Sequence, residues 1–242
     1  MNKALTTYCT DQKWIGRAHC ETCHIRKLML FSKLPAEAFK NLLQPIDHFI
    51  SPQGSTIYDV GSKKPFIYSI RKGMVKLEHV AKGGSKRIVR LQSAGSVIGL
   101  ELLGGTEDYH HTAVAITEVD YCRIPVQTTR QLETQYPKLC NDVREQLQNQ
   151  LDLADQWIVT LGSGTAKQRV AQLLLILNEF CSNDHGEFLL FTGEDMAAMI
   201  GIAIETVSRM IAEFKRSNII YKTNNNLYQC NVEALLEITQ GL

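Results

Sequence analysis

Short apolar runs separated by glycines characterise the chain between Leu34 and Pro125. Runs such as FIYSI, MVKLEHV and RIVRL follow one another with turn-forming residues between them, at a spacing of about ten residues. Short strands at such a spacing, punctuated by glycine, are typical of an antiparallel sandwich or barrel. This part of the sequence therefore predicts an all-β domain.

A different periodicity predicts a long helix over residues 126–161. Its apolar positions follow one another in steps of three or four residues: Cys140, Val143, Leu147, Leu151, Ala154, Ile158 and Leu161. This spacing is close to the a and d positions of a coiled coil, which favours pairing with the same helix of a second copy. Packing of the helix against its own β domain is the alternative.

Gly162-Ser163-Gly164 interrupts the helical pattern and predicts a hinge. An amphipathic helix is predicted over residues 166–180, and a compact, mostly helical domain follows. We therefore divide the chain into a cysteine-containing segment (1–30), a β domain (31–125), a long helix (126–161) and a C-terminal domain (162–242). The predicted fold class is α+β.

Residues 192–218, TGEDMAAMIGIAIETVSRMIAEFKRSN, have the pattern of a helix-turn-helix. Thr192 and Asp195 resemble a capping box at the start of the first helix, and Gly201 supplies the turn. In the second helix, apolar residues at i, i+3, i+4 and i+7 face the core: Val207, Met210, Ile211 and Phe214. Such a second helix places its N-terminal residues against base edges in the major groove. The segment NIIYKT-NNN-LYQC that follows predicts a two-stranded wing.

The outward face of this second helix carries residues suited to reading bases. Arg209 can pair with guanine O6 and N7, Glu205 can accept a hydrogen bond from cytosine N4, and Ser208 can reach a base or a phosphate. The other predicted DNA contacts are Thr206, Lys215, Arg216 and the wing residue Lys222. Residues 162–242 have a net charge of −3, so a few well-placed groups must hold DNA rather than bulk charge. A plain helical hairpin with a solvated face is the alternative.

Composition narrows the classes of protein. The 242 residues have a net charge of +1, with 44% hydrophobic and 21% charged residues, as in an ordinary globular protein. Bulk charge alone indicates neither nucleic acid nor a membrane as a partner. The longest apolar run, LLLIL, is too short to span a bilayer, and no export signal opens the sequence. We expect a cytoplasmic protein without membrane contact, whose cysteines are thiols or metal ligands.

The segment Cys20-Glu21-Thr22-Cys23-His24 carries candidate chemistry of its own. The pattern C-x-x-C-H is the attachment signature of a c-type haem. It is equally compatible with half of a metal or iron–sulfur site, or with a metal-free thiol pair in an electron-transfer protein. The expected cytoplasmic location weighs against covalent haem, because that attachment normally takes place outside the cytoplasm.

The order of these parts resembles the Crp/Fnr family of bacterial transcription regulators. A glycine-punctuated β-roll, a long dimer helix and a C-terminal winged helix containing I-x-x-E-T-V-S-R are its features, and the resemblance covers about residues 20–240. It implies a cyclic-nucleotide-binding-like roll, a homodimer, no enzymatic activity and RNA polymerase as a protein partner. In the Fnr branch, the residues at Glu205, Ser208 and Arg209 read TTGAT-type half-sites of a palindrome.

The resemblance also bears on the effector. Cyclic-nucleotide binders of this family clamp the phosphate with an Arg-Ser or Arg-Thr pair, but His111-Thr112 stands in that place here. Since a neutral histidine is a poor substitute for guanidinium at a phosphate, cyclic AMP is not expected to bind. Non-covalent haem at His110-His111 is a further alternative, as is sensing of nitric oxide or another small ligand without a cluster.

Oxygen-sensing members of the family carry a cluster ligand in a Cys-x-Ile-Pro strand, which Cys122 matches within EVDYCRIP. Cys20 and Cys23 match two of their N-terminal ligands. Met29 occupies the place of the usual third, so Cys9 is the remaining candidate for a fourth ligand. The resemblance thus implies a 4Fe-4S cluster held by Cys20, Cys23, Cys122 and Cys9. A zinc site, a thiol switch and a purely structural role remain the alternatives.

Overall fold

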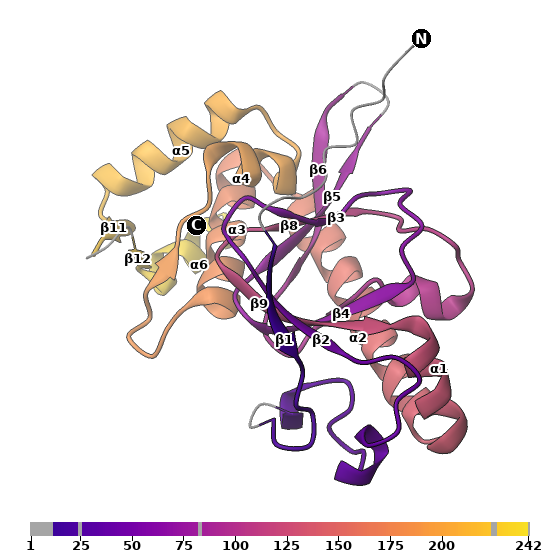
Figure 1. Ribbon diagram of the computed structural model, residues 1–242. Helices are drawn as coiled ribbons and strands as arrows, with labels where there is room; N and C mark the ends of the chain where they lie inside the picture. Colours follow the sequence, from indigo (N-terminus) through magenta and orange to yellow (C-terminus); the bar gives the residue numbers. More distant parts are fainter. Residues whose placement is uncertain (1–11, 24–25, 82–83, 224–226, 242) are drawn as a thin grey trace. The chain divides into compact units, whose positions relative to one another are not determined.

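The computed structural model describes residues 12–23, 26–81, 84–223 and 227–241 (Figure 1). The chain divides into two compact units. The first comprises Met1–His79 with Val89–Asp152, and the second comprises Val80–Ile88 with Leu153–Leu242. The division falls inside a continuous helix rather than at Gly162-Ser163-Gly164. Within the described residues, no helix is long and apolar enough to cross a membrane.

The first unit is a roll of two antiparallel sheets, which confirms the predicted β domain. The five-stranded sheet has the order β1 (Lys13–Arg17), β2 (Asp47–Ser51), β9 (Val119–Pro125), β4 (Phe66–Lys72) and β7 (Val97–Ile98). The four-stranded sheet has the order β3 (Thr56–Tyr58), β8 (Thr112–Ala115), β5 (Val75–Val80) and β6 (Lys86–Gln92). A short 3-10 helix, η3 (Leu100–Gly104), follows β7.

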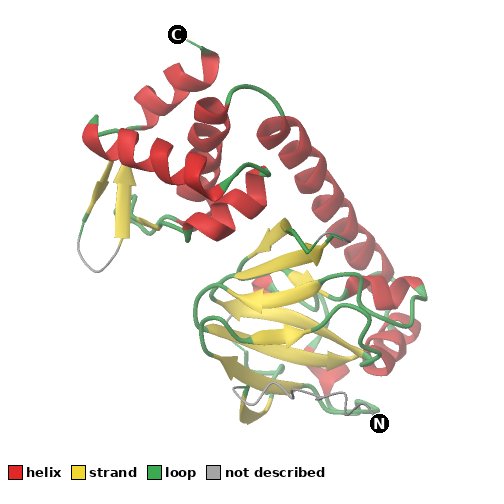
Figure 2. Cartoon of the chain, turned by 90° about the horizontal axis from the view of Figure 1, so that it is seen from above, coloured by secondary structure: helices red, strands yellow, loops and turns green. Residues whose placement is uncertain are grey.

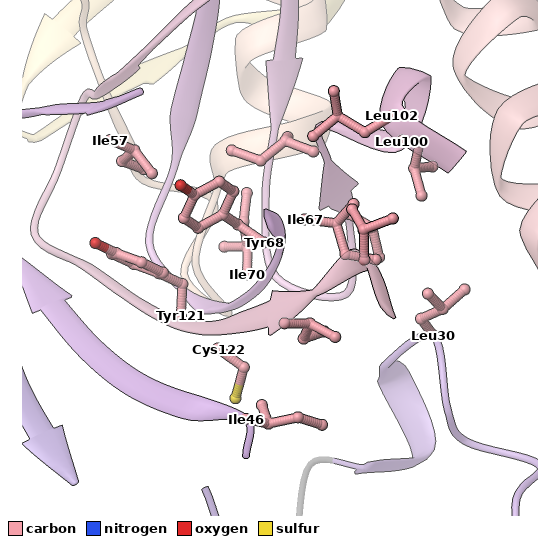
Figure 3. Packing of buried hydrophobic residues seen from close by; sticks show 14 of the residues in the cluster. Leu30, Ile46, Ile57, Ile67, Tyr68, Ile70, Leu100, Leu102, Tyr121 and Cys122 are labelled. Carbon is pink, nitrogen blue, oxygen red and sulfur yellow. The ribbon is translucent and has the colours of Figure 1, made fainter. Parts of the chain in front are cut away.

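Both faces of the five-stranded sheet are covered, and this determines where the cysteine of β9 lies. Successive side chains of a strand point to opposite faces, so Tyr121 and Cys122 point to opposite sides. Figure 3 shows the Tyr121 ring on one side of β9 and the Cys122 sulfur on the other, beside Ile46. In the β4–β9 register, Cys122 lies opposite Ser69. Cys122 therefore belongs to the outer face of the sheet.

The N-terminal segment covers this outer face. It contributes the edge strand β1 and two 3-10 helices, η1 (Arg26–Leu28) and η2 (Ala36–Phe39). Its apolar residues Leu30, Phe31, Leu34 and Phe39 belong to the hydrophobic core of the roll. The strand β1 was not predicted, because KWIGR is mostly exposed and has no buried apolar alternation. The segment thus packs as part of the roll.

The single helix predicted over residues 126–161 is wrong, because the structure has two helices there. They are α1 (Val126–Gln135) and α2 (Leu139–Gly162). Tyr136 leaves the helical region with φ −131° and ψ 79°, and Pro137 follows it. Proline disfavours helical geometry in the residue before it and cannot donate to the preceding turn. The proline therefore separates α1 from α2.

The second unit is mostly helical, as predicted, with a small sheet (Figure 2). Its helices are α3 (Ala166–Cys181), α4 (Gly193–Ile200), α5 (Ile204–Arg216) and α6 (Val232–Gln240). The wing pairs β11 (Ile220–Lys222) with β12 (Leu227–Cys230), and β10 (Phe188–Leu189) adds a third strand that was not predicted. Thr165 begins α3 with a complete capping box formed with Gln168.

Candidate functional sites

Helices α4 and α5 form the predicted helix-turn-helix. The Thr192 hydroxyl caps α4 by accepting a hydrogen bond from the backbone N–H of Asp195 at 3.1 Å. Gly201 ends α4 in the left-handed conformation, with φ 65° and ψ 44°. Glycine adopts this conformation without the strain that a side chain would introduce, so it permits the tight turn into α5.

Helix α5 separates an apolar face from a polar one. Val207, Ile211 and Phe214 are buried, whereas Glu205, Ser208 and Arg209 are exposed on the other face. The three residues predicted to read bases therefore share one accessible surface near the start of the helix. Thr206, also a predicted contact, is only partly exposed.

The predicted phosphate contacts differ in how they are held. The Lys215 ammonium lies 3.1 Å from the Tyr228 hydroxyl and 4.7 Å from the centre of that ring, so the wing fixes its position. Arg216 and Lys222 are exposed. On the same helix, Glu213 pairs with Lys167 of α3 at 2.7 Å, and this hydrogen bond lowers the pKa of the Glu213 carboxyl.

The positions of the predicted dimer seam are divided between core and surface. Val143 and Leu161 are buried within the chain at 6% and 4% exposure, and Leu147 packs against the roll core. Leu151 and Ile158 are 53% and 71% exposed, as is the neighbouring Val159 at 71%. The C-terminal half of α2 thus presents an apolar stripe that the described chain does not cover.

Cys20, Cys23 and Cys122 line one cavity of about 30 Å³ beneath the N-terminal segment. The rest of its wall is largely apolar and includes Leu30, Phe39 and Ile46. Met29, at the place of the family's usual third N-terminal cysteine, also lines the cavity, and its sulfur accepts a hydrogen bond from Ser69 at 3.5 Å. Cys9, the predicted fourth ligand, lies outside the described residues.

Burial and the neighbouring thiols favour the protonated form of Cys20 and Cys122. Burial, followed by the neighbouring Cys122 and Cys23, raises the pKa of the Cys20 thiol to about 12. Burial also raises the pKa of Cys122, and a hydrogen bond from Arg71 opposes that rise. A metal centre that displaces the proton is therefore needed before Cys20 and Cys122 can act as thiolates.

The donor set suits an iron–sulfur cluster better than a single metal ion. Within the described residues, no three His, Cys, Asp or Glu side chains are arranged to hold one ion together. Each thiolate of a four-iron cluster binds a different iron, so its ligands need not converge on one point. Three thiols around one largely apolar cavity fit three of the four positions that such a cluster requires.

Arg71 was not recognised from the sequence, although its guanidinium lies near two of the thiols. Its Nη1 is 3.7 Å from the Cys23 sulfur and 3.9 Å from the Cys122 sulfur. Its Nε is 3.0 Å from Asp120 Oδ1, which also lies 2.6 Å from His48 Nε2. A register shift between β4 and β9 at Ile70 and Lys72 places Arg71 in a bulge. The alternation in FIYSIRK sets Arg71 on the same face as Ser69, but the bulge itself has no local signal in the sequence.

His111-Thr112 stands where cyclic-nucleotide binders of the family clamp the phosphate, and neither of these residues supplies a guanidinium group. His111 is partly buried, and burial, followed by the nearby Arg90, lowers the pKa of its imidazole. His110 is exposed, so the two adjacent histidines face different surroundings. Arg90 is turned to Gln150 of α2, with its Nη1 3.5 Å from the amide oxygen.

Comparison with known proteins matches both units to families. Residues 168–238 match the Crp-like helix-turn-helix domain, and residues 51–136 match the cyclic nucleotide-binding domain. Together these matches span well over half of the chain.

Relatives match along most of their length. The transcriptional regulatory protein btr of Bordetella pertussis is 26% identical over 209 residues, 84% of this chain and 86% of its own. The fumarate and nitrate reduction regulatory protein of Vibrio cholerae is 26% identical over 226 residues, 91% of this chain and 90% of its own.

Solved structures agree with the fold. FixK2 from Bradyrhizobium japonicum has a TM-score of 0.71 at 20% identity, covering 79% of this chain and 96% of its own. A CRP/FNR-family transcriptional regulator from Thermus thermophilus has a TM-score of 0.64 at 27% identity, covering 80% and 98%. With the roll, the winged helix-turn-helix and both family matches in place, the chain belongs to the Crp/Fnr family of DNA-binding transcription regulators, which are not enzymes.

Proposed function

We propose that this regulator acts as a homodimer, binds palindromic TTGAT-like sites, and responds to oxygen or redox state through a cysteine-ligated iron–sulfur cluster. The observation that carries the DNA-binding part is the single exposed face of α5 with Glu205, Ser208 and Arg209. Residues at the start of a recognition helix are those that reach base edges. RNA polymerase is the protein partner that this role implies.

The proposed dimer uses the exposed stripe of α2. Leu151, Ala154, Ile158 and Val159 lie on its C-terminal half, and pairing with a second copy would bury them. Two recognition helices in such a dimer would lie about 34 Å apart, one turn of DNA. That spacing matches the two half-sites of a palindrome.

Base recognition is tested by replacing Arg209 with alanine. We expect a loss of about 1–3 kcal/mol in binding to a TTGAT palindrome, together with relaxed preference at one guanine. Fluorescence anisotropy on a set of single-base variants of the site, at fixed salt, measures both effects. Arg216→Ala is the matched control, because loss of a phosphate contact weakens binding to all sequences equally. Uniform loss for Arg209→Ala would contradict base reading.

The proposed sensor uses Cys20, Cys23 and Cys122, with Cys9 as the fourth ligand. Its support is the convergence of three thiols from the N-terminal segment and β9 on one cavity. When bound, an iron–sulfur cluster supplies a redox-active, oxygen-labile centre. The protein contributes a largely apolar wall, which limits the access of water to the cavity. It also places the cationic side chain of Arg71 beside two of the sulfurs.

The same segment connects the cavity to α2. Leu30 and Phe31 follow the cysteines and are buried in the roll core. Lys33 then pairs with Asp142 of α2 at 2.5 Å. A change in how the cavity is filled can thus alter how this segment packs against the helix that we propose as the dimer interface.

Anaerobic purification with iron and sulfide analysis and a visible spectrum tests the sensor. We expect about four irons per chain, bleached by air, in line with four thiolate ligands. Cys122→Ala and Cys9→Ala should each lose most of the iron, whereas Cys140→Ala, which removes a thiol outside the cavity, should retain it. Colourless, iron-free protein after anaerobic reconstitution would rule the cluster out and leave Cys20 and Cys23 as a thiol pair.

A further inference from the structure

Two arginines, Arg26 and Arg71, contribute to the wall of the cysteine cavity. Arg26 Nη1 is buried and finds no hydrogen-bond acceptor within the described part of the chain. Arg71 Nη1 lies near two of the cysteine sulfurs, while its Nε lies 3.0 Å from Asp120 Oδ1. Buried N–H groups are nearly always paired in folded proteins, so the unpaired donor of Arg26 beside the cavity points to an occupant that accepts hydrogen bonds.

Arg71 is held in a fixed orientation toward the sulfurs. Its Nε lies 3.0 Å from Asp120 Oδ1 and forms an ion pair with that carboxylate. The same oxygen lies 2.6 Å from His48 Nε2. The bulge in β4 directs the side chain across the outer face, where Nη1 approaches both Cys23 and Cys122. Bulges of this kind re-aim side chains beside functional sites.

Arg26 approaches the cavity from the segment that carries the first two cysteines. Its backbone N–H donates to the carbonyl of Cys23 at 3.1 Å, which ties it to the cysteine turn. Its guanidinium lies 5.8 Å from the centre of the Phe39 ring. Both arginines are also near enough to Cys20 to act on its thiol electrostatically. The two guanidinium groups therefore belong to the same site from different elements.

We propose that Arg26 and Arg71 form a cationic clamp whose Nη1 groups donate to the sulfur atoms of an anionic iron–sulfur cluster in this cavity. The inference rests on the cluster proposed above. Thiolates and sulfides make such a cluster negative, and its sulfurs accept hydrogen bonds, so the cluster supplies the acceptor that Arg26 lacks and a counter-charge for both arginines. Net charge and hydrogen bonds to the sulfurs set the reduction potential of such clusters. The clamp stabilises the more negative, reduced state and so raises the potential.

The test compares Arg26→Met, Arg71→Met and Arg71→Lys after anaerobic reconstitution with ferrous iron and sulfide. The matched control is Arg123→Met, which removes the same charge from the residue next to Cys122. Arg123 pairs with Asp47 at 2.9 Å and stacks on Phe49 and Phe66, and it does not line the cavity. The measurements are iron content, the midpoint potential by anaerobic redox titration, and the rate of bleaching in air. Unfolding curves of the iron-free proteins verify that each variant folds.

We expect each methionine variant to shift the midpoint more negative by about 59 mV or more, a tenfold change in a one-electron equilibrium. Bleaching should be faster, because a lower potential favours oxidation. Arg71→Lys should recover part of the shift, and Arg123→Met should show little. If the wild type holds four irons but Arg26→Met and Arg71→Met keep its potential and bleaching rate, the clamp is wrong and the cluster stands. If the wild type binds no iron, the cluster and the clamp both fall.

Discussion

At the scale of single residues, the environment of the cysteine cavity changes the acid–base chemistry of the thiols in it. Burial raises the pKa of Cys20 from the ordinary 9.0 to about 12, whereas Arg71 acts in the opposite direction. This pKa shift makes the free energy of unfolding depend on pH. Since the folded-state pKa exceeds the unfolded one, the group stabilises the fold below about pH 9, and that contribution is lost as pH rises toward 12.

This shift predicts an unreactive Cys20 in the iron-free protein. The thiolate is the nucleophile, so a pKa of about 12 lowers its fraction at neutral pH by about a thousandfold. Alkylation by iodoacetamide at pH 8, followed by peptide mass spectrometry, should be at least about a hundredfold slower at Cys20 in folded protein than in urea-unfolded protein. The rate should still be rising at pH 10. A plateau near pH 9 would contradict the shift.

At the scale of elements, the sequence predicted the pieces with regular patterns and missed those fixed by tertiary contact. The helix-turn-helix was readable because the apolar positions of α5 and the turn at Gly201 are local signals. The break between α1 and α2 was also readable in principle, because Pro137 lies inside the apparent helix. The coiled-coil pattern does not signal the break, because its apolar positions begin at Cys140, after the proline.

The cysteines of the cavity were predicted from the sequence, but the arginines beside them were not. Cys20, Cys23 and Cys122 were singled out through the family resemblance, and the structure brings all three to one cavity. Arg71 and Arg26 were not, because their roles depend on a bulge in β4 and on the packing of η1 against the roll. No local pattern encodes a register shift between two strands that are distant in sequence.

At the scale of the whole molecule, the exposed apolar stripe of α2 predicts the oligomeric state. Replacing Ile158, which is 71% exposed, with glutamate should convert the proposed dimer to monomer without altering the unfolding transition of the isolated chain. Light scattering after size exclusion measures the mass. The matched control is Val143→Ala in the same helix, at a buried position. It should lower stability by about 1–3 kcal/mol yet leave the dimer intact. A mass unchanged by Ile158→Glu would exclude this stripe as the interface.

Helix α2 continues across the boundary between the two units. The number of residues in it therefore determines the rotation, about the helix axis, of the chain that follows. The helix has 24 residues, and the division of the chain into two units falls between Asp152 and Leu153. One alanine inserted after Asp155 would turn everything beyond it by about 100°, whereas seven would bring it back to within about 20° of the original phase.

In a dimer whose helices run nearly parallel, lengthening the helix moves both DNA-binding units along the shared axis and preserves the distance between the recognition helices. Rotating the units about the helix axis changes the direction in which each recognition helix faces. Gel-shift titration on the palindrome should therefore find binding abolished by the single insertion and largely restored by the sevenfold one. Equal loss in both variants would mean that the helix does not keep the two recognition helices in register.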